Sequence, residues 1–280
     1  MNILIIGNGF VGKRCADAWS DATLIDTRVN SVQEVLALID THQPDVILNA
    51  AGVRGKPNVD WCETHQLETI AGNVTLPIMI AEACQSRGIY LLHIGSGCIF
   101  YGESPDPKGW KEEDFGNPSA VYSKSKYAAD LALSVLPNVG IGRIRMPMDY
   151  IPSSGNIIDK LAQYSKIIDV ENSLTVIEDM VAVFRQLLEK KATGIFHVTN
   201  PGSIRHRDII ALYEALVEPL PPKEWVKDED QVALGLTQKK RSTNILQNIA
   251  LTKWGITMRS VQEAARETMM KYAEMKKKGV

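Results

Sequence analysis

The chain has 280 residues, of which 45% are hydrophobic and 23% charged, and its formal net charge is -2. This composition fits a globular protein with a large core, and the small net charge argues against a nucleic-acid-binding face, so small molecules are the expected partners. No apolar run approaches the roughly 18 residues that a membrane-spanning helix requires. A short apolar start and four scattered cysteines favour a reducing cytoplasm.

Strand-like and helix-like segments alternate along the first half of the chain. Residues 3–6 form a continuous apolar run typical of a buried parallel strand, and a glycine-rich turn and a helix-like stretch (10–19) follow. This alternation predicts an α/β fold with a doubly wound parallel sheet of the Rossmann type. Further predicted strands are 23–26, 45–49, 90–94 and 139–145, and further predicted helices are 32–40, 69–86 and 119–136.

The regular alternation ends near Pro147, beyond which prolines interrupt shorter elements. We therefore expect residues 1–146 to form a dinucleotide-binding domain and residues 147–280 to form mainly a smaller C-terminal substrate lobe. A helix-like stretch (178–191) and an apolar run (194–198) are expected to rejoin the first domain, within about 174–200. Residues 260–275 predict a closing helix.

A glycine-rich turn joins the first predicted strand to the first predicted helix. Gly7, Gly9 and Gly12 fit G-x-G-x-x-G, in which glycines permit a tight turn and close approach of a pyrophosphate to a helix N-terminus. In this position the motif predicts a dinucleotide site rather than a simple glycine-rich turn. The predicted cofactor-binding residues are Gly7, Gly9, Phe10, Val11, Gly12, Asp26, Arg28, Asn49, Ala50, Ala51 and Gly52, together with Tyr122 and Lys126.

The second predicted strand ends at Asp26, whose carboxylate suits the ribose hydroxyls of NADH and would repel the 2′-phosphate of NADPH. Arg28 would instead neutralise such a phosphate, unless it is an ordinary surface arginine. The sequence therefore predicts NADPH or NADH and leaves the preference open. The small residues 49–52 are expected where backbone passes close to the dinucleotide.

A second constellation lies around Ser96 and Tyr122. On a helix, Tyr122 and Lys126 are four residues apart and share a face, so the ammonium is expected to lie beside the phenol and favour its ionised form. The pair predicts a proton donor for a carbonyl, and Ser96 would hydrogen-bond the same oxygen. Cys98 adds a titratable thiol that a plain ketone reductase does not need.

These residues resemble the extended short-chain dehydrogenase/reductases, and within them the dTDP-4-dehydrorhamnose reductase branch. The resemblance extends from Gly7 to about Asn248, and it is closest to the bifunctional nucleotide-rhamnose synthase/epimerase-reductases known from plants. The blocks that carry it are NAAGV (49–53), PNVDWCE (57–63), GCIF (97–100), KEED (111–114), RIRMP (143–147) and TNPG (199–202).

The resemblance implies an NAD(P)H-dependent enzyme that takes a UDP- or dTDP-4-keto-6-deoxy-glucose, inverts C3 and C5, and reduces C4 to give the nucleotide-L-rhamnose. It implies that Tyr122 is the proton donor to the C4 oxygen and that Lys126 binds the nicotinamide ribose. Ser96 stands where the family has Ser or Thr. Cys98 and Lys160 match the cysteine and lysine of the epimerisation pair, which completes the implied catalytic set.

The chemistry of such a sugar agrees with these roles. C3 and C5 flank the C4 ketone, so their protons are acidified, and inversion requires removal of a proton from one face and its return on the other. Two titratable groups are needed, and a thiol and a lysine whose pKa is lowered by burial exchange protons near neutral pH. Ser96 and Tyr122 would hold the enolate oxygen formed between the two steps.

Several alternatives stay open from the sequence. The enzyme could be a monofunctional dTDP-4-dehydrorhamnose reductase, or the chain could be a non-catalytic dinucleotide-binding regulatory subunit. The choice of UDP or dTDP and the oligomeric state, a homodimer included, are also open. Cys62 and His65 lack a second ligand pair, so no metal is expected. The predicted substrate-binding residues, some of which are alternatively surface charges, are Arg54, Lys56, Asn58, Cys98, Asn156, Asn172 and Arg241.

Overall fold

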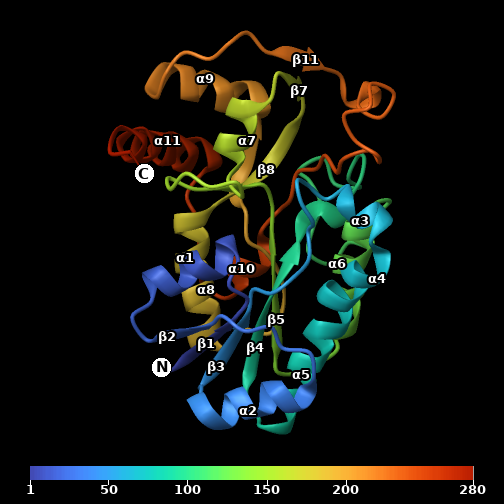
Figure 1. Ribbon diagram of the computed structural model, residues 1–280, viewed down its shortest axis with the longest axis vertical. Helices are drawn as coiled ribbons and strands as arrows, with labels where there is room; N and C mark the ends of the chain where they lie inside the picture. The colour runs from blue at the N-terminus through green and yellow to red at the C-terminus, as the bar shows by residue number, and fades with distance from the viewer. Residues whose placement is uncertain (280) are drawn as a thin grey trace.

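The computed structural model describes residues 1–279 and contains a six-stranded parallel sheet in the order β2-β1-β3-β4-β5-β9 (Figure 1). β1 (Ile3–Ile6) pairs on one side with β2 (Ala22–Ile25) and on the other with β3 (Val46–Asn49), so the strand order reverses at this point. Ligands of such sheets bind beyond the carboxyl ends of the strands at the reversal. The remaining strands are β4 (Tyr90–Ser96), β5 (Val139–Ile144) and β9 (Gly194–His197).

Helices cover both faces of this sheet, because its strands are apolar on both sides. One hydrophobic cluster joins one face to α1, α8 and α10, and a second joins the other face to α2, α5 and α6. The predicted doubly wound α/β fold is therefore confirmed. These helices are α1 (Phe10–Ala18), α2 (Val32–His42), α5 (Leu76–Ser86), α6 (Val121–Leu133), α8 (Ile177–Lys190) and α10 (Ile249–Lys253).

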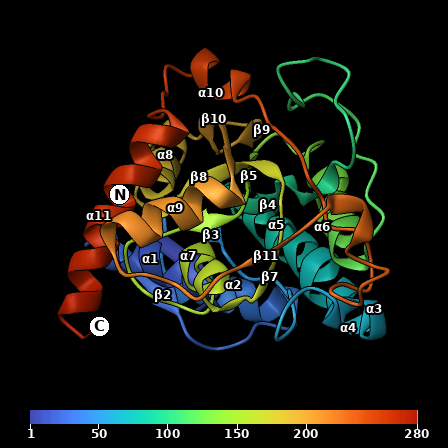
Figure 2. The ribbon, with the colours of Figure 1, turned by 90° about the horizontal axis from the view of Figure 1, so that it is seen from above.

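A smaller lobe lies above the sheet in Figure 1, and its elements overlie the sheet when the molecule is seen from above in Figure 2. It contains a three-stranded sheet, β10-β8-β6, and a two-stranded sheet, β11-β7, and its own hydrophobic cluster joins them to helices. Its elements are β6 (Pro147–Met148), α7 (Ile157–Gln163), β7 (Lys166–Ile168), β8 (Glu171–Val176), β10 (Asn200–Arg205), α9 (His206–Leu216), β11 (Glu224–Val226) and α11 (Val261–Lys277).

The two parts are interleaved along the chain. α8 and β9 follow the first four lobe elements, yet α8 packs on the large sheet and β9 pairs with β5. α10 returns once more to the large sheet before α11 completes the lobe. We therefore propose a division in which the dinucleotide-binding domain comprises β1–β5 and their helices together with α8, β9 and α10.

The helix predicted over 69–86 is interrupted. α4 (Gln66–Ile70) leads into a π-helical turn, η1 (Ala71–Thr75), before α5 begins. Within this turn Asn73 accepts a hydrogen bond from the Val53 N–H (2.7 Å), and its amide donates to the Ser125 Oγ (3.0 Å). The interruption therefore turns one side chain inward, to hold the loop after β3 against α6. Such π-turns are often found at functional sites.

All four cysteines are free thiols in the described structure. Cys15, Cys62 and Cys84 are fully buried, whereas Cys98 is partly exposed. Burial raises the pKa of Cys15 and Cys84 to about 12 and also raises the pKa of Cys62. Separately, none of the helices within residues 1–279 is both long enough and apolar enough to cross a bilayer.

A buried ion pair joins α6 to β5. The Arg143 Nε donates to the Asp130 Oδ2 at 2.7 Å, and both side chains are almost completely enclosed. Arg143 also lies 3.3 Å from the His197 Nε2, on β9. The pair therefore fixes the helix that carries Tyr122 and Lys126 against the sheet.

We predict that Asp130→Asn lowers the free energy of unfolding by about 3–5 kcal/mol, because it leaves the Arg143 guanidinium buried without a counter-charge. Asp40→Asn removes the exposed pair between Arg87 and Asp40 and should cost much less, because solvent screens an exposed ion pair. Urea unfolding of both variants measures the difference. Equal, small losses would show that the buried pair does not hold α6.

Candidate active site

The glycine-rich turn has the geometry that a pyrophosphate requires. Gly7 has a φ of +117°, and a Cβ there would lie 2.3 Å from the Ala51 N. A Cβ on Gly12 would lie 2.0 Å from the Gly7 O, whereas a Cβ on Gly9 would meet nothing within 4 Å. Gly9 caps α1, whose first turn carries no acidic residue. The turn therefore offers an open, positively polarised helix end that fits a dinucleotide phosphate.

The other predicted cofactor residues surround this turn. Asp26 is exposed beyond β2 and accepts a hydrogen bond from the Asn8 amide, and Arg28 is exposed nearby. Phe10 lies against Gly155 of the lobe, where a Cβ would come within 2.9 Å of its ring. Val11 packs on the core beneath.

The loop after β3 lies beside the turn, as the small residues 49–52 predict. The Asn49 Oδ1 accepts from the Ala51 N–H at 3.0 Å, and the Ala50 N–H donates to the Ile6 O at 2.8 Å. Gly52 is exposed, and a Cβ there would lie 3.0 Å from the Asn73 Oδ1. The loop is thus held close to β1 with no bulky side chain over the turn.

Tyr122 lies in the first turn of α6, which faces the carboxyl end of β4. The Glu63 carboxylate accepts a hydrogen bond from the Val121 N–H (2.8 Å) and so anchors this helix end. Burial, and then Cys98, raise the pKa of Tyr122, while a hydrogen bond with Ser96 lowers it. Tyr122 therefore stays protonated at neutral pH, with Ser96 beside it.

Lys126 lies one turn further along α6 and is buried. Its Nζ donates to the Ile94 O at 2.7 Å and lies 3.2 Å from the His93 Nε2. Burial lowers the pKa of Lys126 to about 8, against an opposing effect of Asp130, and burial keeps the pKa of His93 well below its usual value. The lysine is tied to β4 rather than to the tyrosine.

The expectation that Lys126 favours the ionised phenol is wrong for this structure. The pKa of Tyr122 is raised, because loss of water around the phenol outweighs the favourable contacts. The Lys126 Nζ instead donates to the Ile94 O on β4. Because Tyr122 remains neutral, it keeps the proton that it can donate.

Cys98 follows β4 in a short turn, η2 (Gly97–Ile99). Its N–H donates to the Ser96 Oγ at 3.2 Å, and its Sγ accepts from the Arg145 Nη1 at 2.7 Å. The sulfur is partly exposed and acts on the pKa of both Tyr122 and Lys160. The structure therefore brings Cys98 together with the other predicted catalytic residues.

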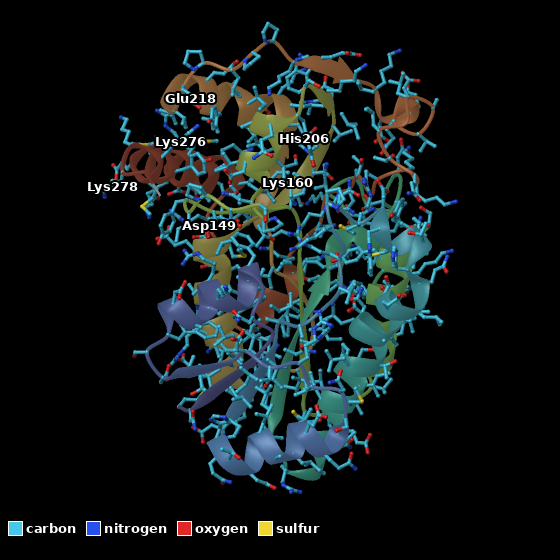
Figure 3. The ribbon with its side chains drawn as sticks, viewed as in Figure 1. Asp149, Lys160, His206, Glu218, Lys276 and Lys278 are labelled. Atoms are coloured by element: carbon cyan, nitrogen blue, oxygen red, sulfur yellow. The ribbon has the colours of Figure 1, made fainter. Side chains whose placement is uncertain are left out.

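Lys160 approaches from the lobe, on α7. Figure 3 shows it near the boundary between the two parts of the molecule, whereas Glu218, Lys276 and Lys278 lie on the outer part of the lobe. Burial, then Arg54 and Arg241, lower the pKa of Lys160 to about 8, and Cys98 opposes this effect. The predicted downward shift by burial is confirmed.

Four predicted substrate residues lie on the loop after β3 and on the lobe segment that reaches it. Arg54 and Lys56 are exposed on the loop after β3, and Asn58 is half-buried. Arg241 crosses to this loop from the lobe: its Nη2 lies 2.7 Å from the Asp60 Oδ2 and 3.3 Å from the Asn58 Oδ1. Both views place the 228–246 segment beside α3 (Trp61–Thr64) (Figures 1 and 2). Arg54, Arg241 and Lys160 are therefore three cationic side chains in one region, in which Asp60 is the counter-charge of Arg241.

Asn156 and Asn172, both predicted to bind substrate, are buried and hydrogen-bonded within the protein. Asn156 is fully buried and caps α7 by accepting a hydrogen bond from the Ile158 N–H. Its amide nitrogen donates to the Asp149 O and the Ile151 O. Asn172 accepts through its Oδ1 from Arg145 (2.6 Å) and from the Asn244 N–H (3.0 Å). Asn156 therefore caps α7 in this structure, and the Asn172 Oδ1 accepts from protein donors.

Sequence reasoning missed three residues of the site, namely Glu63, Asn73 and Arg145. Arg145 belongs to the RIRMP block, but a single arginine after a strand carries no signal of a contact with Cys98. Glu63 lies in the PNVDWCE block without a pattern that relates it to α6. The contacts of Asn73 depend on the π-helical turn, which the sequence pattern does not predict.

Two curated relatives are similar over most of this chain. The bifunctional dTDP-4-dehydrorhamnose 3,5-epimerase/dTDP-4-dehydrorhamnose reductase of Arabidopsis thaliana is 35% identical over 229 residues, covering 78% of this chain and 76% of the relative. A trifunctional UDP-glucose 4,6-dehydratase/UDP-4-keto-6-deoxy-D-glucose 3,5-epimerase/UDP-4-keto-L-rhamnose-reductase of the same plant is 30% identical and covers 95% of this chain. The chain spans only 40% of that trifunctional relative.

Solved structures share the fold. The UDP-rhamnose synthase of Acanthamoeba polyphaga mimivirus superposes with a TM-score of 0.90 at 28% identity, covering 97% of this chain and 99% of that chain. The dTDP-4-dehydrorhamnose reductase of Bacillus anthracis, solved with NADP, superposes with a TM-score of 0.81 at 20% identity, covering 96% and 99%. Further neighbours that share the fold were solved with NADPH or with NAD.

Residues 1–271 match the family described as the RmlD substrate binding domain. This match spans both the large sheet and the lobe, and it agrees with the resemblance seen in the sequence blocks. The chain belongs to the RmlD substrate binding domain family, the family of the dTDP-4-dehydrorhamnose reductases.

Proposed function

We propose that the chain is an NAD(P)H-dependent 3,5-epimerase/4-reductase that converts a UDP- or dTDP-4-keto-6-deoxy-glucose to the nucleotide-L-rhamnose. The observation that carries the proposal is that two sets of reactive side chains lie together at the carboxyl end of β4. Ser96, Tyr122 and Lys126 supply the parts of a carbonyl reductase, and Cys98 and Lys160 supply two further titratable groups. The similarity to bifunctional and trifunctional relatives supports the same pairing of activities.

Reduction of the C4 ketone requires a proton for its oxygen. Tyr122 is neutral at working pH and would give its proton to that oxygen, with Ser96 as a second hydrogen-bonding group. The Lys126 ammonium, which is held on β4, would act through the cofactor by binding the nicotinamide ribose, rather than through the phenol. Bound NAD(P)H supplies the hydride that C4 receives.

The residues that would hold the dinucleotide are those around the glycine-rich turn. Gly7, Gly9 and Gly12 leave the helix end open to the pyrophosphate, and Asp26 stands where ribose hydroxyls are bound in this fold. Lys126 would contact the nicotinamide ribose. Since Asp26 and Arg28 are both exposed at this end, either NADH or NADPH fits the proposal.

Inversion at C3 and C5 requires two groups that face opposite sides of the sugar. Cys98 comes from the large domain and Lys160 from the lobe, so a ring bound between the two parts would have one group on each side. Ser96 and Tyr122 would hold the enolate oxygen while a proton is exchanged.

The group of cations formed by Arg54, Arg241 and Lys160 supports a substrate whose sugar is attached to a nucleoside diphosphate. Arg54, Arg241 and Lys160 lie close enough for both arginines to lower the pKa of the lysine. An arginine pair of this kind suits phosphate oxygens, which accept two hydrogen bonds from one guanidinium. The proposal leaves UDP and dTDP as equal candidates.

We predict that Tyr122→Phe lowers the reduction rate by at least about 100-fold, because the C4 oxygen loses its proton donor. Ketone-dependent oxidation of NAD(P)H measures the rate, and titration of cofactor fluorescence should show nearly unchanged cofactor binding. Tyr127→Phe, on the same helix, is the matched control. An active Tyr122→Phe variant would contradict the proton-donor role, whereas the absence of ketone-dependent oxidation in the unmodified protein would favour a non-catalytic dinucleotide-binding subunit.

We predict that reduction of an already epimerised substrate declines as the pH rises through about 8, because Lys126 has a pKa of about 8 and its ammonium is then lost. The phenol does not cause this decline, since the pKa of Tyr122 is raised. The pre-epimerised sugar also removes any need for Lys160. Rates measured from pH 6 to 10 test the assignment, and a flat profile would rule out a requirement for the ammonium.

We predict that Cys98→Ala abolishes solvent deuterium uptake at C3 and C5 of the 4-keto sugar, while a pre-epimerised sugar is still reduced. Mass spectrometry of the sugar and oxidation of NAD(P)H measure the two activities. Cys84→Ala, which removes a buried thiol far from the site, is the control. Unchanged deuterium uptake would remove Cys98 from the mechanism, and no uptake by the unmodified protein would indicate a monofunctional reductase.

A further inference from the structure

His93 is a fully buried histidine of β4 that connects the loop after β3 to Lys126. It lies opposite Asn49 in the parallel pairing of β3 with β4. Its Nδ1 is 3.0 Å from the Asn49 Nδ2, and its Nε2 is 3.2 Å from the Lys126 Nζ. These are the contacts of the ring nitrogens within residues 1–279, so each nitrogen faces one neighbour.

The direction of these hydrogen bonds is fixed at the Asn49 end. The Asn49 Oδ1 accepts from the Ala51 N–H at 3.0 Å, so the Asn49 Nδ2 is the atom that faces His93. An amide nitrogen only donates, and the His93 Nδ1 is therefore the unprotonated nitrogen that accepts. Burial, and then Lys126, keep the pKa of His93 well below its usual value, so the ring is neutral and carries its one proton on Nε2.

The proton on the His93 Nε2 faces Lys126. A lysine can accept a hydrogen bond only as the neutral amine, because the ammonium has three donors and no lone pair. As an amine, Lys126 accepts from Nε2–H, donates to the Ile94 O at 2.7 Å, and keeps one N–H for a ligand. As an ammonium, it would place a donor against the Nε2–H in the interior, where an unmade hydrogen bond is costly.

Reversing the chain of hydrogen bonds does not remove this conflict. With its proton on Nδ1, His93 could accept from the ammonium, but Asn49 would then have to turn its oxygen toward the ring. The Asn49 amide would face the Ala51 N–H, which is also a donor. Because the chain starts at a fixed backbone donor, every bond in it is made only when Lys126 is the final acceptor.

The charged groups around Lys126 leave this preference in place. Burial lowers the pKa of Lys126 to about 8, and Asp130 opposes this effect from the same helix. Asp130 is itself bound by Arg143 of β5 at 2.7 Å. His93 is therefore the buried side chain that aims a donor at the Lys126 nitrogen.

The other titratable groups at this end of α6 lie nearer to Tyr122. Burial raises the pKa of Tyr122, and Cys98 of η2 and Cys62 of α3 add to this effect. Tyr122 therefore stays protonated, one turn before Lys126, and brings no charge to it.

We propose that His93 is a positioning residue that donates its Nε2–H to Lys126, favours the neutral amine, and so sets the pH at which the ammonium is lost. Asn49 orients the ring, and the Ala51 N–H orients Asn49. Burial alone would disfavour any charge at this place, whereas the bond from His93 adds a directional preference for the amine. The inference rests on the proposed function only for the part that Lys126 plays in reduction.

The first test is the tautomer of His93 in the unmodified full chain, read by nitrogen-15 NMR after histidine labelling. The ring signals are assigned by through-bond connection to the His93 backbone. We expect a protonated Nε2 and an unprotonated Nδ1 from about pH 6 to 9. A proton on Nδ1, or an imidazolium in this range, would overturn the proposal without any variant.

The second test is the titration of Lys126, followed by the carbon-13 shift of its Cε in lysine-labelled protein. The midpoint should lie near pH 8 in the unmodified chain. His93→Leu should move it upward by about one pH unit or more, because one unit corresponds to roughly one hydrogen bond. The ammonium then persists to higher pH, so the decline in reduction of a pre-epimerised sugar should shift upward by the same amount.

His206→Leu is the matched control, since it removes a histidine of α9 in the lobe and should leave the Lys126 midpoint unchanged. Circular dichroism and cofactor binding verify folding. A folded His93→Leu variant with an unchanged midpoint would overturn the role of His93.

Asn49→Asp reverses the chain of hydrogen bonds. A carboxylate accepts at both oxygens, so it can bind the Ala51 N–H and a His93 Nδ1–H together. The ring should then carry its proton on Nδ1 and accept from the Lys126 ammonium, which nitrogen-15 NMR would detect. An unchanged tautomer in the folded variant would show that Asn49 does not orient His93.

The outcomes also separate this inference from the proposed function. The expected tautomer and the upward shift in His93→Leu, in a protein that reduces no ketone, would retain the role of His93 and refute the reductase. Ketone reduction with the same pH profile in His93→Leu and in the unmodified protein would retain the reductase and overturn the role of His93.

Discussion

The position of α6 against β4 and β5 governs the candidate active site, because Tyr122 and Lys126 lie on this helix and Ser96 ends β4. Three buried polar contacts fix that position. The Lys126 Nζ donates to the Ile94 O, the Asn73 amide donates to Ser125, and the Arg143–Asp130 pair closes the far end. Each contact would be costly to leave unmade in the interior, so the helix has little freedom to shift or rotate.

The second half of the site depends on a segment that connects the lobe to the turn carrying Cys98. Ser242 donates to the Phe100 O (2.6 Å), and the Asn244 amide donates to the Gly97 O (2.9 Å). Leu246 then packs with Phe100 and Trp110. The lobe thus holds the turn that carries Cys98 and also supplies Lys160. The position of the Cys98 sulfur therefore depends on how the two parts pack together.

The fold of the large domain could be predicted from the sequence because β1–β4 are short apolar runs followed by helical stretches, with glycines at the first turn. Apart from the closing helix predicted over 260–275, which is α11, the lobe could not, since strands such as β6 and β7 are two or three residues long and owe their existence to tertiary contacts. Lys160 and Cys98 were found by resemblance, whereas Arg145 required the coordinates, because its partners Asn172 and Ser242 are distant in sequence. The sequence did not predict that the pKa of Tyr122 is raised, because helical spacing does not reveal how deeply a side chain is buried.

The interleaving of the two parts has a consequence for how the protein is made. A chain emerging from the ribosome presents β1–β5 early, but the edge strand β9 and the covering helices α8 and α10 arrive only after much of the lobe has been synthesised. The lobe in turn waits for α11, which supplies part of its core. Neither part is complete until its last helix has been made, so the nascent chain exposes apolar strand surface until then and completes both cores within a short stretch of sequence.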